Sequence, residues 1–314
     1  KTDGNSRSFQ EAYYNGPTSY ISTRSATGAY GKRMQYQADG VLSYAKTFGK
    51  GHNLEARVGI SFFQRDTTSL QATGQGASSD LIPTLNASAV PVSVTGQESR
   101  QVLVGYFSRI NYDYNGKYLL SFSARYDGAS NLGAKNQWGL FPGVSAGWNL
   151  HQEEFWKNIP EGLLRMKLRA SYGINGNISG LGDFQSQGQY SVGSQYNGKA
   201  AVTNTVLANA DLQWERSKTI DIGTDIGLIN NRINVMFDYY RRVTDNLITS
   251  LNLPYSTGFS AVSTNLGSLE NRGVELEVRA NVLAPSSPLQ WVVSFNAAKT
   301  KQKILKLPSN GNPN

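Results

Sequence analysis

Apolar and polar residues alternate one by one between Tyr118 and Tyr126. The even positions carry Tyr, Leu, Phe, Ala and Tyr, whereas the odd positions carry Leu, Ser, Ser and Arg. Because a period of two places successive side chains on opposite faces of a β-strand, this segment predicts a strand. One face of that strand is apolar and ends in a tyrosine on either side, and the opposite face is small, polar and charged.

The same alternation recurs along the chain in segments of about 10 to 14 residues. Strands of soluble proteins average ~5–6 residues, whereas a tilted strand that crosses a membrane needs ~9–11. The expected strands cover residues 34–48, 54–65, 100–114, 118–126, 138–149, 164–174, 214–228, 232–243, 272–283 and 290–300.

The connections between these segments alternate between short and long. Asn115-Gly116 in one short connection is a strong hairpin signal, because both central residues of a type I′ turn need a positive φ. We expect one helical turn at 153–157, and polar loops at 1–32, 66–99, 127–137, 175–212 and 245–270. Short turns on one side and long loops on the other are typical of up-and-down membrane barrels.

Aromatic residues stand near the ends of the apolar faces, as in the girdles that mark the two membrane interfaces of such barrels. These residues are Tyr112, Tyr118, Tyr126, Trp138, Trp148, Trp214 and Trp291. A soluble β-sandwich, in which the aromatic face is simply the core, is the alternative. A sheet of this width needs closure or covered edges, so we expect further strands beyond both ends of the chain.

The composition agrees with an all-β protein and excludes several other classes. The chain has 314 residues, 32 glycines, 17 tyrosines, no cysteine and a formal charge of +8. Without cysteine it has neither a disulfide framework nor a cysteine metal site. No run of ~18 apolar residues predicts a transmembrane helix. The chain begins with Lys1 and lacks a signal peptide, so we expect it to be a mature segment or a fragment.

Two features that could suggest other chemistry have simpler interpretations. His52 and His151 fall in short turns without metal ligands at a suitable spacing, so we expect no metal site. The basic run Lys299, Lys301, Lys303 and Lys306 could bind nucleic acid, but its alternation favours the solvated end of a strand. No arrangement of catalytic or cofactor-binding residues is evident, so the sequence predicts neither an enzyme nor a cofactor.

A series of motifs, each weak alone, occurs in one order along most of the region between Leu42 and Leu307. They occupy residues 105–114, 116–120, 125–130, 138–142, 145–148, 168–173, 176–177, 212–215, 238–240, 265–267 and 270–275. As an ordered set they are specific. The chain resembles the barrel of the SusC/RagA-type TonB-dependent outer-membrane transporters of Bacteroidota.

The resemblance implies a transmembrane barrel of about 22 strands, plugged from within by an N-terminal domain. It implies import of oligosaccharides or peptides across the outer membrane of a Gram-negative bacterium, with the long loops extracellular. The implied partners are outer-membrane lipid, a SusD-like surface lipoprotein and the TonB–ExbB–ExbD complex. Residues 1–314 would form part of one barrel domain, with the plug, the TonB box and the last strands outside this segment. A passive porin and a soluble sandwich that acts as a binding module are the alternatives.

Substrate contacts are expected in the long loops, where aromatic rings can stack on sugars or pack on peptide side chains. The candidates are Tyr190, Tyr196, Tyr255 and Phe259, although these rings could instead pack the loops against one another. Within the strands, we expect Phe122 to face lipid and Arg125 to face the lumen.

Overall fold

The computed structural model describes residues 2–160, 162–284 and 286–307, which divide into two compact units. Unit 1 comprises Lys1–Ala38 and Phe62–Leu103, and unit 2 comprises Asp39–Ser61 and Val104–Asn314. Three long strands contribute to both units: β4 (Ser25–Phe48), β5 (His52–Ala77) and β6 (Ser88–Tyr114).

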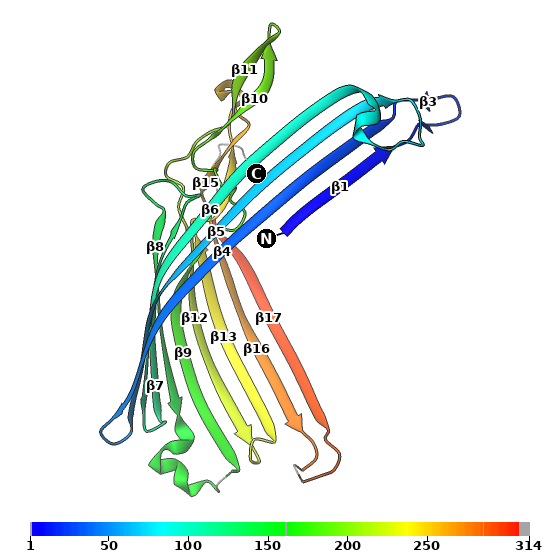
Figure 1. The fold of residues 1–314 in the computed structure, drawn as a ribbon. Helices are drawn as coiled ribbons and strands as arrows, with labels where there is room; N and C mark the ends of the chain where they lie inside the picture. Colours follow the sequence, from blue (N-terminus) through cyan, green and yellow to red (C-terminus); the bar gives the residue numbers. More distant parts are fainter. Residues whose placement is uncertain (1, 161, 285, 308–314) are drawn as a thin grey trace. The chain divides into compact units, whose positions relative to one another are not determined.

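Unit 1 contains a strand at the beginning of the chain. Here β1 (Thr2–Gln10) pairs antiparallel with the first part of β4, from Thr2 opposite Arg33 to Gln10 opposite Ser25. The strand order continues to β5 and β6 (Figure 1). The smaller elements of this unit are β2 (Tyr13–Tyr14), β3 (Tyr20–Ile21) and the 3₁₀-helix η1 (Leu85–Ala87).

The expected loops at 1–32 and 66–99 are wrong for most of their length. Residues 2–10 form β1, and the second expected loop is largely the end of β5 and the beginning of β6. Most of these stretches carry Ser, Thr, Gly and Gln on both faces and lack the apolar alternation that marks a half-buried strand, although Val90, Val92 and Val94 do alternate with other residues at the beginning of β6. Their backbone groups are nevertheless paired with neighbouring strands, and that pairing leaves no hydropathy signal.

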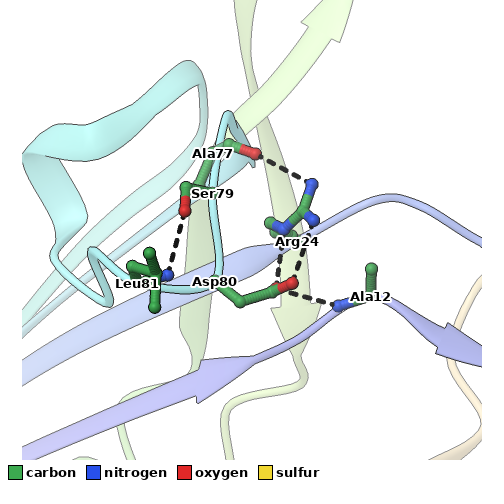
Figure 2. A network of polar contacts seen from close by, with 6 residues as sticks. All are labelled: Ala12, Arg24, Ala77, Ser79, Asp80 and Leu81. Atoms are coloured by element: carbon green, nitrogen blue, oxygen red, sulfur yellow. Dashed lines mark hydrogen bonds and ion pairs between the residues drawn. The ribbon is translucent and has the colours of Figure 1, made fainter.

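An ion pair joins two connections of unit 1 (Figure 2). The Arg24 guanidinium donates to both carboxylate oxygens of Asp80, with Nε 2.6 Å from Oδ1 and Nη2 2.9 Å from Oδ2. The same carboxylate accepts the backbone N–H of Ala12 at 3.3 Å, and Arg24 Nη1 lies 3.5 Å from the Ala77 carbonyl oxygen. The carboxylate therefore ties the loop after β5 to the chain on both sides of β3.

Unit 2 contains strands that follow one another in chain order, each antiparallel to the next (Figure 1). It begins with the parts of β4, β5 and β6 that belong to unit 2, which are the parts next to the short turns. The strands that follow are β7 (Tyr118–Ala129), β8 (Trp138–Asn149), β9 (Leu164–Asn177), β12 (Glu215–Leu228), β13 (Ile233–Asp245), β16 (Ser268–Asn281) and β17 (Val292–Lys306). Every expected strand in this region is found, although several extend further at the ends that join the long connections. The meander confirms the antiparallel all-β prediction.

The short turns use the predicted backbone geometry. Asn115 has a φ of 53° and Gly116 a φ of 66°, as a type I′ turn requires. The turn between β12 and β13 has positive φ at Ile229, Asn230 and Asn231. The expected helical turn at 153–157 is confirmed as a 3₁₀-helix, η3 (Glu154–Asn158), which follows η2 (Leu150–Gln152). No helix in the described part of the chain has the length and apolar character needed to span a membrane.

Two of the long connections contain hairpins of their own, which the sequence did not reveal. In one, β10 (Gln189–Tyr196) pairs with β11 (Lys199–Val206) through a turn with positive φ at Asn197 and Gly198. In the other, β14 (Ile248–Asn252) pairs with β15 (Ala261–Asn265), and the 3₁₀-helix η4 (Tyr255–Thr257) lies between them.

The apolar residues of the sheet are not buried by the rest of the chain. Phe122 is 51% exposed and Ile222 55%, whereas Leu132 and Leu212 in the long connections are 1% and 0% exposed. A soluble sandwich would bury the apolar face of its sheet against a second layer. The described residues supply no such layer, so this face requires an apolar phase outside them, as a membrane provides.

Candidate functional site

Hydrogen-bond register divides the strands of unit 2 into two faces, because residues directly opposite each other project to the same side. One face, called the apolar face, contains Phe122 opposite Val144 and, further along, Ile222 opposite Tyr239. The other, called the polar face, contains Arg125. Phe122 and Arg125 therefore lie on opposite faces, as the sequence predicts.

The polar face carries a row of small hydroxyl side chains that ends in a carboxylate. Ser121 of β7 lies opposite Ser145 of β8, which lies opposite Ser171 of β9, which lies opposite Asp221 of β12. Ser121 Oγ donates to the side-chain oxygen of Asn111 on β6 at 2.8 Å. These residues line a groove of ≈650 Å³ on the polar face.

At one side of this groove, a single guanidinium bridges three carboxylates from two strands. Arg169 of β9 donates from Nε to Asp225 Oδ1 at 2.9 Å and from Nη2 to Asp238 Oδ2 at 2.7 Å. Its Nη1 lies 3.5 Å from Asp221 Oδ1. The side chain of Arg169 is 31% exposed, so the cluster is partly shielded from solvent. We call Arg169, Asp221, Asp225 and Asp238 the arginine cluster.

A missing side chain makes the arginine cluster possible. Gly223 of β12 lies between Arg169 and Asp238, opposite Arg169 on β9 and opposite Asp238 on β13. A Cβ at this position would clash with Asp238 Oδ1 and would lie 2.9 Å from Arg169 Cζ. Because glycine leaves this space open, Arg169 reaches across one whole strand to the next.

Further carboxylates continue from the arginine cluster along the polar face. Glu275 of β16 lies directly opposite Asp238, and Glu277 lies opposite Met236. Both glutamates are exposed, and like charges that face each other across a strand pair are unfavourable. The polar face therefore carries two exposed carboxylates beside the arginine cluster.

The arginine cluster was not predicted from the sequence, although part of it had a signal there. Asp221, Gly223 and Asp225 alternate with isoleucine and threonine, so they share the polar side of their strand. Counting back from the Asn230–Asn231 turn pairs Gly223 with Asp238. The position of Arg169 had no such signal, because a long connection separates β9 from β12.

On the apolar face, aromatic rings form a continuous series of contacts at the short-turn end of the strands. His52 stacks on Phe48 with ring centroids 5.6 Å apart and lies 4.6 Å from Tyr114. The series continues from Tyr114 through Tyr118 and Trp148 to Phe155 and Trp156, with centroids 6.2–6.5 Å apart. Tyr106, Tyr126 and Trp138 form a second group nearer the long connections.

The predicted girdle is wrong for Trp214. This tryptophan is 7% exposed, donates its indole N–H to the Gln137 carbonyl oxygen at 2.9 Å, and packs edge-on against Phe141. Phe141 lies opposite Arg125 and thus on the polar face. Trp214 precedes β12, where strand alternation no longer determines the direction of its side chain.

One carboxylate in the turn after β8 holds the aromatic series in place. Glu153 accepts hydrogen bonds from Tyr118 Oη at 2.7 Å, Trp148 Nε1 at 3.0 Å and Lys117 Nζ at 3.3 Å. The hydrogen bond from Tyr118 makes the largest contribution to lowering the pKa of the Glu153 carboxyl, and the bond from Trp148 makes the next largest. Together with Lys117 they lower the pKa of the Glu153 carboxyl below its ordinary value.

The three long connections of unit 2 are joined by hydrogen bonds into one assembly. The side-chain oxygen of Asn265 accepts the N–H of Gln213, and its NH₂ group donates to the carbonyl oxygens of Gln213 and Asn246, each at 2.8–2.9 Å. Gly133 N–H donates to the Leu212 carbonyl oxygen at 2.9 Å. Residues 127–137, 178–214 and 246–267 therefore form a connected surface, which we call the loop assembly.

The four candidate substrate residues lie in the loop assembly but not at one site. Tyr190 is opposite Asn204 and Tyr196 is opposite Lys199. These two partners are five positions apart on β11, an odd offset, so the tyrosines project to opposite faces. A register shift between Ser191 and Ser194 causes this reversal.

The other two candidates belong to the second hairpin. Tyr255 is 93% exposed at its tip, whereas Phe259 is half-buried beside the Thr257 hydroxyl.

Both histidines bond within the protein at short turns. His52 Nδ1 lies 2.7 Å from Tyr112 Oη, and His151 Nδ1 lies 3.2 Å from the Met166 carbonyl oxygen. Across the described ranges, no group of three His, Asp or Glu side chains is placed to hold a metal ion.

Relatives of known identity match this chain over most of its length. TonB-dependent receptor P39 of Formosa agariphila is 34% identical over 275 residues, which is 87% of this chain and 26% of the relative. TonB-dependent receptor SusC of Bacteroides thetaiotaomicron is 34% identical over 220 residues, 68% of this chain and 22% of the relative. The chain therefore spans about a quarter of the length of the curated relatives it matches.

A solved structure shares the fold. The structure of the RagAB peptide transporter aligns with a TM-score of 0.86 and 23% identity, covering 97% of this chain and 34% of that one. The family model described as TonB dependent receptor-like, beta-barrel matches residues 1–313. Proteins of this family are outer-membrane β-barrels of Gram-negative bacteria. The chain thus belongs to the TonB-dependent receptor-like β-barrel family and forms part of the barrel wall.

Proposed function

We propose that this chain is barrel wall from a TonB-dependent importer that moves oligosaccharides or peptides across the outer membrane through a plugged lumen. The observation that carries the proposal is the match of the family model to residues 1–313, together with the likeness to SusC. The two unlike faces of the strands support it, because a lumen-bearing barrel needs an apolar exterior and a polar interior.

The polar face is the part of the wall that would meet the interior of the barrel. This face offers hydroxyl and carboxylate groups to a hydrated interior. The hydroxyl groups belong to Ser121, Ser145 and Ser171, and the carboxylates belong to the arginine cluster and to the exposed Glu275 and Glu277. No nucleophile with an adjacent base is evident in the described part of this face, and the family consists of transporters rather than enzymes. Membership of a transporter family supports a role in passage and binding.

The loop assembly is the proposed site of contact with substrate and with a SusD-like lipoprotein lid. Tyr196 and Tyr255 are 81% and 93% exposed on two separate hairpins, which makes them available to a partner. Because Tyr190 lies on the opposite face of its hairpin from Tyr196, we expect one of these two tyrosines to matter more than the other. Energy would come from the TonB–ExbB–ExbD complex acting through parts of the protein outside this chain.

The test is uptake of labelled oligosaccharides and of labelled peptides by cells that carry the full-length gene. Deletion of the gene is expected to abolish uptake of one of these classes, and deletion of tonB is expected to abolish the same uptake. Uptake that persists without TonB would identify a passive porin and contradict active import. Tyr196→Ala and Tyr190→Ala form a matched pair, because they remove the same ring from opposite faces of one hairpin.

A further inference from the structure

A cluster of positive charge lies on the apolar face near its long-loop end. In the register, Arg241 of β13 lies opposite Arg272 of β16, and Arg272 lies opposite Lys301 of β17. Lys299 and Lys303 flank Lys301 on the same face, because they are two residues away in the same strand. We call these five residues the basic row.

The basic row lies on the side of the sheet that faces the membrane. Two residues along β13 from Arg241, Tyr239 lies opposite Val274, and Phe237 lies opposite Leu276. These residues belong to the apolar face, and Lys299 lies directly opposite Val274, so the basic row overlaps the end of this run of apolar residues. A step of two residues along a strand is about 7 Å, so Arg241 and Arg272 lie about 7 Å beyond Tyr239 and Val274 on the way to the long connections.

One carboxylate orders part of the basic row without neutralising it. Glu270 lies opposite Lys303, is 6% exposed, and accepts from Arg241 with Nε at 2.7 Å. Arg272 Nε is 3.9 Å from the other oxygen of the same carboxylate. Both guanidinium groups remain about half exposed. Five cations and one anion leave a net charge of four, carried by side chains that point toward lipid.

The three lysines of the row are exposed and make no ion pair with any residue that the structure describes. The sequence predicted the solvated end of a strand for these lysines, and the register adds that they share a face with Val274 and Leu276. An uncompensated cluster of cations at that level needs an anionic partner, and the membrane supplies one in the phosphate groups of its lipids. Guanidinium groups in particular bind phosphate with two parallel hydrogen bonds.

We propose that the basic row is a binding site for the phosphate groups of the glycolipid in the outer leaflet. Arg241 and Arg272, positioned by Glu270, contact a phosphate directly, and Lys299, Lys301 and Lys303 add charge from the neighbouring strand. The site is a lipid contact of the barrel exterior and is independent of what passes through the lumen.

The full-length protein in detergent is titrated with micelles of phosphorylated lipid A and, in parallel, with the same glycolipid after removal of its phosphates. We expect binding to the phosphorylated form that weakens as NaCl is raised, and little binding to the dephosphorylated form. The combined variant Arg272→Gln, Lys301→Gln and Lys303→Gln is expected to bind the phosphorylated form ~100-fold more weakly, at about fivefold for each removed cation.

A matched control removes the same charge from the polar face: Arg165→Gln, Lys167→Gln and Arg279→Gln. This control variant is expected to bind like the wild type, and heat-modifiable gel mobility checks that both variants are folded. Equal weakening in both variants would mean that net charge alone attracts the lipid and would overturn the proposal. Binding of inorganic phosphate as tight as that of phosphorylated lipid A would also overturn it, because the site would then not be a lipid site.

Discussion

Arg169 and Asp238 are joined by a 2.7 Å hydrogen bond although a complete strand lies between theirs. The bond exists because Gly223 on the intervening strand has no side chain. Three adjacent strands are thereby fixed to one another on the polar face by a single guanidinium. This is the most specific arrangement that the chain places on the side facing the barrel interior.

Gly223→Ala is expected to break the bond between Arg169 and Asp238 and to lower the free energy of unfolding by about 1–3 kcal/mol. The added methyl group would clash with the Asp238 carboxylate and crowd the guanidinium. The measurement is the urea midpoint of the protein reconstituted in lipid. Gly173→Ala is the control, because a Cβ there has no neighbour closer than 4.0 Å. Equal midpoints for the two variants would contradict a structural role for the cluster.

Phe122→Arg is expected to destabilise the membrane-inserted protein by ~2–4 kcal/mol if the side chain lies mid-bilayer, because a charge on the lipid face must leave water. Ser123→Arg places the same side chain on the polar face and is expected to cost much less. Folding yield into vesicles, read from heat-modifiable mobility, distinguishes the two. Normal insertion of Phe122→Arg alongside failure of Ser123→Arg would mean that the faces are reversed.

Acid is expected to loosen the turn that holds the aromatic series. The pKa of Glu153 is lowered in the folded protein, so its stabilising contribution is present above the unfolded-state pKa of about 4.3 and is lost as the pH falls through the folded-state value. Unfolding midpoints of the wild type and of Glu153→Gln, measured between pH 7 and pH 3, test this. The variant is expected to be less stable at pH 7 and to lose less on acidification. Parallel pH curves would contradict the assignment.

The loop after β5 depends on the ion pair between Arg24 and Asp80 (Figure 2). The Arg24 hydrogen bond lowers the pKa of the Asp80 carboxyl, so the pair persists at neutral pH. Asp80→Asn is expected to weaken the tie to Arg24 and to speed proteolysis between residues 78 and 87. Ser79→Ala, which removes only a hydroxyl that accepts the N–H of Leu81 at 3.1 Å, is the neighbouring control. Unchanged cleavage in Asp80→Asn would show that the pair does not hold the loop.

Alternation in the sequence was sufficient to predict the strands of unit 2, because each has one apolar and one polar face. It failed for β1 and for the outer half of β5, where both faces are largely polar, and the alternation of Val90, Val92 and Val94 in the outer half of β6 was missed. The positive φ values at Asn115 and Gly116 followed from the residue types. The pairing of residues on two strands joined by a short turn could be counted outward from the turn, as for β12 and β13. The pairing of strands joined by a long connection, such as β9 and β12, could not be counted in this way.

Side-chain direction in the loops was beyond sequence reasoning. Tyr190 and Tyr196 are six positions apart, and regular alternation would place both on one face. The register shift inside β10 reverses that relation, and nothing in the local residue types demands a bulge there. The phosphate-binding proposal has the same origin, since Lys301 gains its meaning only from Arg272 on the neighbouring strand and from Arg241 on the strand after that.

The most direct test of the account is a single-cysteine scan from Tyr118 to Tyr126 in a full-length protein from which any cysteine outside these 314 residues has been removed; the 314 residues themselves contain none. Each full-length variant is spin-labelled in lipid vesicles, and its accessibility to oxygen and to a water-soluble nickel complex is measured. Even positions are expected to be accessible to oxygen from the lipid, and odd positions to nickel from the lumen. Accessibility without a period of two, or with the two sets exchanged, would contradict a barrel wall with its apolar face toward the membrane.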